Sequence, residues 1–105
     1  MGYGKITRDV AKRIINSDTD SVLVDVGTKK EFDENHMEGA ISFPNESIDV
    51  VTADCLLPDK NKLTLVYSKG DGKSRDASKK LVQMGYSNIK EFGIENDWGN
   101  NDFTE

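Results

Sequence analysis

Apolar residues follow two alternating patterns along the chain. Compact apolar runs occur at 22–26 (VLVDV) and 63–67 (LTLVY), and residues 40–44 and 88–92 form two further candidate strands. Lys5 and Ile6 could start another short strand. Continuous apolar runs bounded by polar breaks predict strands that are buried on both faces, as in a parallel sheet.

The segments between these strands carry helical signals. Thr7 and Thr28 are suitable N-cap residues, and Gly85 is a suitable residue to follow the end of the last helix. The predicted helices cover residues 8–16, 29–34, 46–53 and 74–84. Strands and helices that alternate this often predict an α/β fold, with a small parallel five-stranded sheet, helices on both faces and one domain over residues 1–105.

The amino-acid composition argues against several classes of function. A net charge of −5 disfavours non-specific binding to nucleic acid. There is no apolar run of membrane-spanning length, and MGYGKITRDV lacks the apolar core of a signal peptide, so we expect a cytoplasmic protein that does not bind membranes. A single cysteine and a single histidine predict neither a disulfide nor a metal site, and no cofactor is expected.

The segment LVYSKGDGKSRDASKKL, residues 65–81, carries the main candidate for chemistry. Gly72, Lys73 and Ser74 match the end of a nucleotide-binding P-loop. The leading glycine of that motif would fall on Tyr67, and without it the loop lacks the wide turn that surrounds a phosphate. The nucleotide interpretation is therefore weak.

The same segment resembles the active-site loop of rhodanese-like domains. In that family a strand ends in Tyr-Cys, and a loop of the form Cys-x-x-Gly-x-Arg-Ser leads into a helix. Tyr67 and Ser74 match, Ser68 takes the place of the Cys and Lys73 that of the Arg. The usual glycine position is flanked by two glycines of this chain, at 70 and 72.

The resemblance extends over nearly the whole chain. Two further family signatures are matched by residues 22–48 and by residues 81–98. Gly27 replaces a family Arg, Asn35 a Gly, and Ile94 a second Gly. The matching residues are Asp25, Val26, Glu31, Phe32, His36, Gly39, Ala40, Gly85, Tyr86, Asn88, Gly93 and Trp98.

The resemblance implies a sulfurtransferase. In the family a cysteine thiolate takes a sulfane sulfur from a donor and passes it, as a persulfide, to a thiophilic acceptor. The implied partners are a small sulfur-containing anion such as thiosulfate, or a protein persulfide or thiol. Ser68 occupies the catalytic position, and Asp25 and Arg75 are expected to support the site. The residues of the expected anion-binding loop are Lys69, Gly70, Asp71, Gly72, Lys73 and Ser74.

Ser68 argues against turnover. An alcohol has a far higher pKa than a thiol, and oxygen cannot form a persulfide, so we expect the chain to be inactive as it stands. Ser68 could be natural or could replace a cysteine, and the departures at Gly27 and Ile94 favour natural divergence.

Three other functions remain open, with different support. The same loop could serve a non-enzymatic module that binds sulfate, phosphate or a partner's carboxylate. A phosphatase related to this fold would need a cysteine and a loop one residue longer. A hydrolase dyad of Ser68 with His36 is disfavoured, because the resemblance gives that histidine a structural role.

Other residues have less specific roles. Cys55 is expected to be a small buried apolar side chain instead of a relocated nucleophile. Asp25 is expected to cap the helix at 28–34 and to organise the loop before it, in preference to catalysis. Trp98 is expected to anchor the C-terminal turn in the core.

Overall fold

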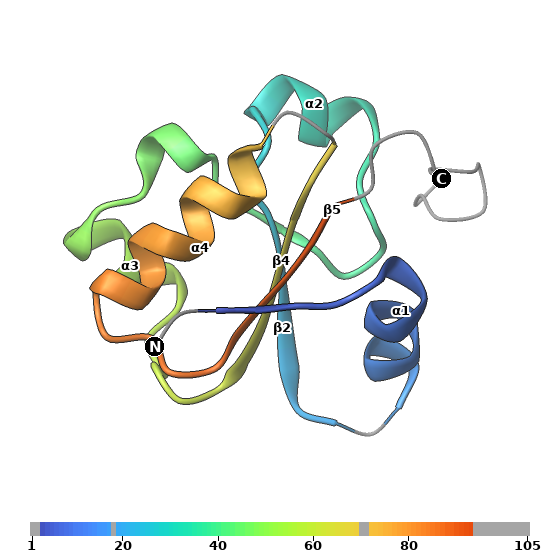
Figure 1. Ribbon diagram of the computed structural model, residues 1–105. Coiled ribbons are helices and arrows are strands. Elements are labelled where there is room, and N and C mark those ends of the chain that lie inside the picture. Colours follow the sequence, from blue (N-terminus) through green and yellow to red (C-terminus); the bar gives the residue numbers. More distant parts are fainter. Residues whose placement is uncertain (1–2, 18, 70–71, 94–105) are drawn as a thin grey trace.

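Five parallel strands form one sheet at the centre of the protein (Figure 1). The computed structural model describes residues 3–17, 19–69 and 72–93. The strands lie in the order β1-β5-β4-β2-β3, so β4 is central. Their bounds are β1 Gly4–Lys5, β2 Ser21–Asp25, β3 Ile41–Ser42, β4 Leu63–Ser68 and β5 Ile89–Gly93.

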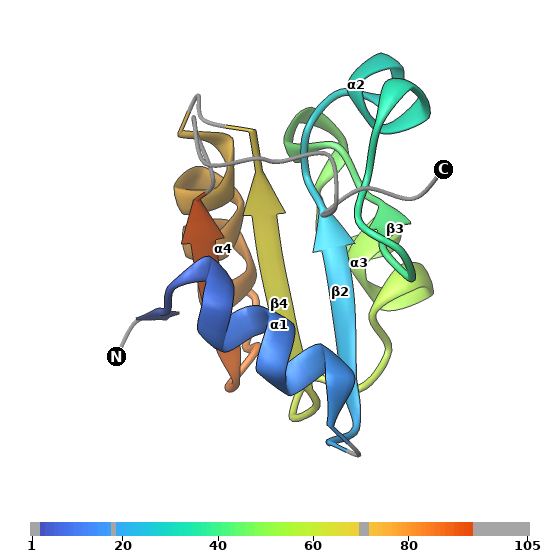
Figure 2. The same cartoon turned by 90° about the vertical axis from the view of Figure 1, so that its right-hand side faces the viewer.

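Helices cover both faces of this sheet, as Figure 2 shows with α1 in front and α3 and α4 behind. A short α2 lies beyond the carboxyl ends of the strands. The helices are α1 Arg8–Asn16, α2 Lys29–Glu34, α3 Val50–Leu56 and α4 Lys73–Gln83, with a 3-10 turn η1 at Asn45–Ser47. The predicted α/β architecture is confirmed.

The two faces explain why the central strands are apolar at consecutive positions. Leu23 and Leu65 pack on the α1 side, and Val24 and Val66 pack on the α4 side. All four side chains are buried, because a parallel sheet that carries helices on both faces has no solvated side.

Local chemistry sets the ends of the helices. The Thr7 hydroxyl accepts the Val10 N–H, and Thr28 and Glu31 form a capping box at the start of α2. Gly85 follows α4 with a φ of 101°, a left-handed conformation that glycine adopts at little cost. These three predictions are confirmed.

The segment between β3 and β4 differs from its prediction. Instead of one helix over 46–53, η1 follows Pro44 and α3 begins after Asp49, whose carboxylate accepts the Thr52 N–H. This cap sets the start of the helix at Val50, and the helix continues to Leu56. Cys55 consequently lies on the outer side of α3 and is exposed, so the expectation of a buried cysteine is wrong.

Several predictions fall outside the described residues. They concern Gly70, Asp71, Ile94 and Trp98, and the single domain over 1–105 likewise stays a prediction. Among the described residues, no helix has the length and apolar character needed to span a membrane.

Candidate functional site

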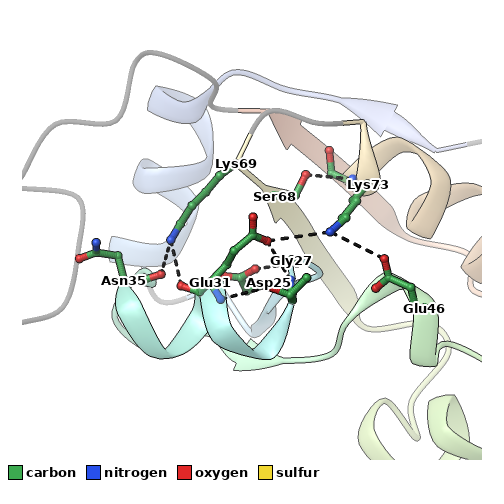
Figure 3. Close-up of polar contacts among 10 residues, drawn as sticks. Asp25, Gly27, Glu31, Asn35, Glu46, Ser68, Lys69 and Lys73 are labelled. Carbon is green, nitrogen blue, oxygen red and sulfur yellow. Dashed lines mark hydrogen bonds and ion pairs between the residues drawn. The ribbon is translucent and has the colours of Figure 1, made fainter.

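Three strand ends meet at one edge of the sheet and bring the predicted site residues together. Asp25 ends β2 and Ser68 ends β4, and the strand register places Asp25 beside Tyr67 and Ser68 beside Gly93. The carboxyl edge of a parallel sheet is where open α/β folds commonly place ligands. Figure 3 shows this edge with α2 and η1 beside it.

Ser68 lies under the start of α4. Its side chain is buried, with the residue 1% exposed, and its Oγ accepts the backbone N–H of Ser74 at 3.1 Å. Gly72 precedes the helix with a φ of 82°, in the left-handed region that favours glycine. The turn therefore directs an N–H from the first turn of α4, where the helix dipole is positive, at the Ser68 side chain.

Ser74 joins this loop to a buried carboxylate that sequence reasoning missed. The Ser74 hydroxyl donates to Glu91 Oε2 at 2.6 Å, and both residues are 4% exposed. Glu91 lies in β5 on the same face of the sheet as Ile89, which packs against α4. The available signal was an acidic residue inside an otherwise buried strand, since glutamate is rarely buried without a partner.

Asp25 is held by the loop that follows β2. Its Oδ1 accepts the Gly27 N–H at 2.9 Å, so the aspartate organises that loop as expected. The cap of α2 is Thr28, so the prediction that Asp25 caps this helix is wrong. Burial raises the pKa of Asp25, while hydrogen bonds from Gly27 and Tyr67 act in the opposite direction.

The two loop lysines point at neighbouring elements (Figure 3). The Lys69 ammonium donates to the backbone carbonyls of Glu31 at 3.1 Å and Asn35 at 2.5 Å, at the carboxyl end of α2. The Lys73 ammonium lies 3.7 Å from Glu46 and 4.0 Å from Glu31. Carboxylates and helix carbonyls therefore offset much of the positive charge that the sequence places around the loop. Arg75 is exposed on α4.

His36 contacts Phe32, four residues before it in the chain. Its Nδ1 lies 2.8 Å from the Phe32 carbonyl oxygen, and its ring stacks on Phe32 with centroids 3.8 Å apart. The described residues contain no cluster of three or more histidine, cysteine or acidic side chains arranged to hold a metal.

Comparison with known proteins decides the family. The model of the rhodanese-like domain matches residues 7–93. The chain belongs to the rhodanese-like domain family. This match covers β2 to β5 and the whole of the Ser68 loop.

Curated relatives of this rhodanese-like domain include two sulfurtransferases. Thiosulfate sulfurtransferase PspE of Escherichia coli is 30% identical over 70 residues, which cover 67% of this chain and 66% of that protein. Adenylyltransferase and sulfurtransferase UBA4 of Meyerozyma guilliermondii is 34% identical over 79 residues. The match covers 70% of this chain but only 18% of UBA4, so the chain corresponds to a small part of that protein.

Solved structures agree with the family. A rhodanese from E. coli solved with anions has a TM-score of 0.61 and 28% identity, covering 68% of this chain and 82% of that one. The rhodanese-like domain of the Alr3790 protein from Anabaena has a TM-score of 0.76 and 23% identity, covering 85% of this chain and 67% of that one. At that identity the second match supports the fold alone.

Proposed function

We propose that this chain is a rhodanese-homology domain whose nucleophile position is held by Ser68, and that it does not transfer sulfur as it stands. One observation carries the proposal: the family loop joins β4 to α4, and the side chain facing the first turn of α4 is a hydroxyl. The donor and acceptor implied by the family are thiosulfate and a thiol, or a protein persulfide in place of thiosulfate.

The chemistry of the hydroxyl supports inactivity. Sulfur transfer needs a thiolate that attacks the sulfane sulfur, breaks its bond to the donor and holds it as a persulfide. The Ser68 oxygen cannot form that persulfide. His36, which could serve as a base, stacks on Phe32, and among the described residues no hydrogen bond joins it to Ser68.

A thiosulfate:cyanide assay tests this proposal. We expect background rates from the unmodified protein and a clear rise in thiocyanate production after Ser68→Cys. Ser78→Cys is the matched control, because Ser78 is a buried serine on α4 outside the loop. Turnover by the unmodified protein at ordinary sulfurtransferase rates contradicts the proposal. Cys55→Ser then reveals whether the exposed thiol was responsible.

A binding module is the second candidate, and the turn at Gly72 favours it. The left-handed glycine and the inward N–H of Ser74 are the parts of an anion-binding nest, whatever atom stands at position 68. Titration with sulfate or thiosulfate, followed by amide NMR, is expected to shift the signals of Gly72, Lys73 and Ser74. Unchanged signals at these residues in saturating anion contradict this second function.

A further inference from the structure

The large apolar side chains that the described part of the protein leaves exposed all lie on α3. Val51 is 70% exposed, Val50 62% and Leu56 44%. Cys55 lies four residues after Val51 and is also exposed, so the two share the outer side of the helix. Single exposed apolar residues are common, but three on one seven-residue helix point to a surface that a partner covers.

The inner side of α3 is fixed to the rest of the protein. Ala53 is buried, and so is Leu57, directly after the helix. The Tyr86 hydroxyl lies 3.0 Å from the Ala53 carbonyl oxygen and 2.5 Å from that of Leu57, so it holds the carboxyl end of α3 in place. The exposed residues therefore belong to an anchored helix and not to a frayed end.

A hollow beside Leu56 extends the apolar surface. It has a volume of about 110 Å³, and its lining residues are Val22, Leu56, Leu57, Pro58, Asp59 and Lys62. Most of this lining is apolar, and the two charged residues follow α3 in the chain. The hollow is several times larger than the space that one water molecule needs, so it can accept an apolar side chain from a partner.

Carboxylates without an ion-pair partner lie at the two ends of α3. Asp49 caps the first turn, and Asp59 comes three residues after the last helical residue. Both are exposed, and among the described residues neither forms a salt bridge. Hydrogen bonds from the backbone and side chain of Thr52 hold the pKa of Asp49 below its ordinary value of 3.8, so this carboxylate is charged at neutral pH.

The chain around α3 does not neutralise these charges. Residues 44–59 contain four acidic and no basic side chains. The lysines that follow directly in sequence, Lys60 and Lys62, pair with Asp54 at 3.0 Å and with Asp20 at 3.2 Å. An apolar surface with an acidic residue at each end is complementary to a segment in which basic residues flank an apolar centre.

We propose that α3 is a docking site for a partner protein, which it binds through an apolar segment that carries a lysine or arginine at each end. The apolar centre of that segment contacts Val51 and Leu56, and its basic ends contact Asp49 and Asp59. A second copy of this chain fits less well, because it brings the same carboxylates to the contact and a net charge of −5. The surface lies outside the loop between β4 and α4, so the proposal stands whether or not that loop binds anions.

Peptide titration of the whole protein tests the chemistry of the partner. Three peptides share one leucine-rich centre and differ at their ends, which are both lysine, both glutamate, or lysine at one end only. The measurement is the shift of the amide NMR signals of residues 50–57 at low ionic strength. We expect the peptide with two lysine ends to bind about tenfold tighter than the peptide with two glutamate ends, and the third peptide to lie between them.

Val51→Ser combined with Leu56→Ser tests the apolar contribution. Both positions are exposed, so the substitutions remove apolar area from the surface and leave the core unchanged. We expect the peptide with two lysine ends to bind about tenfold more weakly to this variant. Unchanged amide signals from the buried strands confirm that the variant is folded.

Asp49→Asn combined with Asp59→Asn tests the charges. Asparagine keeps the N-cap of α3 and the acceptor for the Asn61 N–H, and it removes both negative charges. We expect about fivefold weaker binding of the peptide with two lysine ends. Asp33→Asn combined with Glu34→Gln removes two exposed carboxylates from α2 and is the control, with no change expected.

Three results overturn the proposal. Equal affinities for the peptides with basic and acidic ends contradict the charge complementarity. A titration that leaves the signals of residues 50–57 unchanged contradicts docking at α3. Sedimentation that finds a dimer, which Val51→Ser with Leu56→Ser dissociates, assigns the surface to a second copy of the chain instead.

Discussion

Two buried carboxylates flank the strand that ends in Ser68, and they are held in different ways. Asp25, at the end of the neighbouring β2, accepts a backbone N–H from Gly27. Glu91, on the other neighbouring strand β5, accepts a side-chain hydroxyl from Ser74. The Gly27 N–H is present whatever the side chains are, and Tyr67 adds a side-chain hydrogen bond to Asp25. The hydrogen bond to Glu91 depends on one serine.

The difference shows which side of the site can be tuned by substitution. The contact at Asp25 follows from the path of the chain after β2, so a change at residue 27 to any residue but proline alters it only through sterics. The contact at Glu91 reaches Ser68 through Ser74 and can be removed by changing one side chain. We therefore expect substitutions on the β5 side to have the larger effects.

The largest expected effect is that of Ser74→Ala. It leaves the Glu91 carboxylate buried without its donor, and we expect a loss of about 2 kcal/mol of unfolding free energy. In a Glu91→Gln background the loss should fall to about 1 kcal/mol, because an uncharged acceptor is less costly to leave unpaired. Urea unfolding measures both.

Ser78→Ala is the control for this cycle. Ser78 is equally buried on α4, but its hydroxyl has no hydrogen-bond partner among the described residues. Its removal should therefore be close to neutral. Equal losses at the two serines would show that the bond to Glu91 contributes nothing beyond packing.

Asp25→Asn should change how stability depends on pH. The pKa of Asp25 is raised in the folded protein, so its protonated form is favoured there and its contribution is lost as pH rises. The ordinary pKa of this aspartate is 3.8. As the pH rises from below that value, the unfolding free energy of the wild type should fall relative to that of Asp25→Asn, until the pH exceeds the raised pKa of Asp25. Unfolding curves over this range measure the difference. A difference in unfolding free energy that stays constant with pH contradicts this prediction. Asp33→Asn is the control, because Asp33 is an exposed aspartate.

Gly27→Ala tests the close packing behind Asp25. A Cβ there would lie 2.7 Å from Glu31 Oε1 and 3.1 Å from Asp25 Oδ1, so the flexible Glu31 side chain must move. That movement breaks its bond to the Thr28 N–H, and we expect a loss of about 1 kcal/mol. Thermal unfolding measures it. In a Glu31→Ala background, Gly27→Ala should lower the unfolding free energy by almost nothing further. An equal loss in both backgrounds would show that the added methyl group clashes with a residue other than Glu31.

Glu46→Gln should have the smallest effect. The side chain of Glu46 is 62% exposed, and its contact with Lys73 is 3.7 Å long. Exposed ion pairs contribute little, so we expect a change within about 0.5 kcal/mol in chemical unfolding. A loss as large as that of Ser74→Ala would show that the rim, and not the buried pair, holds the loop.

The fold was predictable because its signals are local. The apolar runs at 22–26 and 63–67 mark the two central strands, and Thr7, Thr28 and Gly85 mark helix ends that the structure confirms. The segment after Pro44 was mispredicted, because Asp49 and Thr52 cap each other and delay the helix. The same shift placed Cys55 on the outside of α3.

Only those site residues that belong to a sequence motif could be predicted. The position of Ser68 followed from the loop motif, while the role assigned to it stays a prediction. The engagement of Lys69 with α2, and of Glu91 with Ser74, joins residues more than 15 positions apart in sequence. The first contact depends on the register of β2 against β4 and the second on that of β5 against β4, and a single sequence does not encode either register in any short pattern.

The two outer strands of the sheet limit how copies of the protein can associate through their sheets. β1 and β3 lie at the two edges, and each has two residues. A long exposed edge offers a row of unpaired amides and carbonyls to which another chain can add a strand. Edges this short offer almost no such template. The long apolar strand β4, which could drive aggregation, is thus kept in the interior of the sheet, where β2 and β5 pair with it along most of its length.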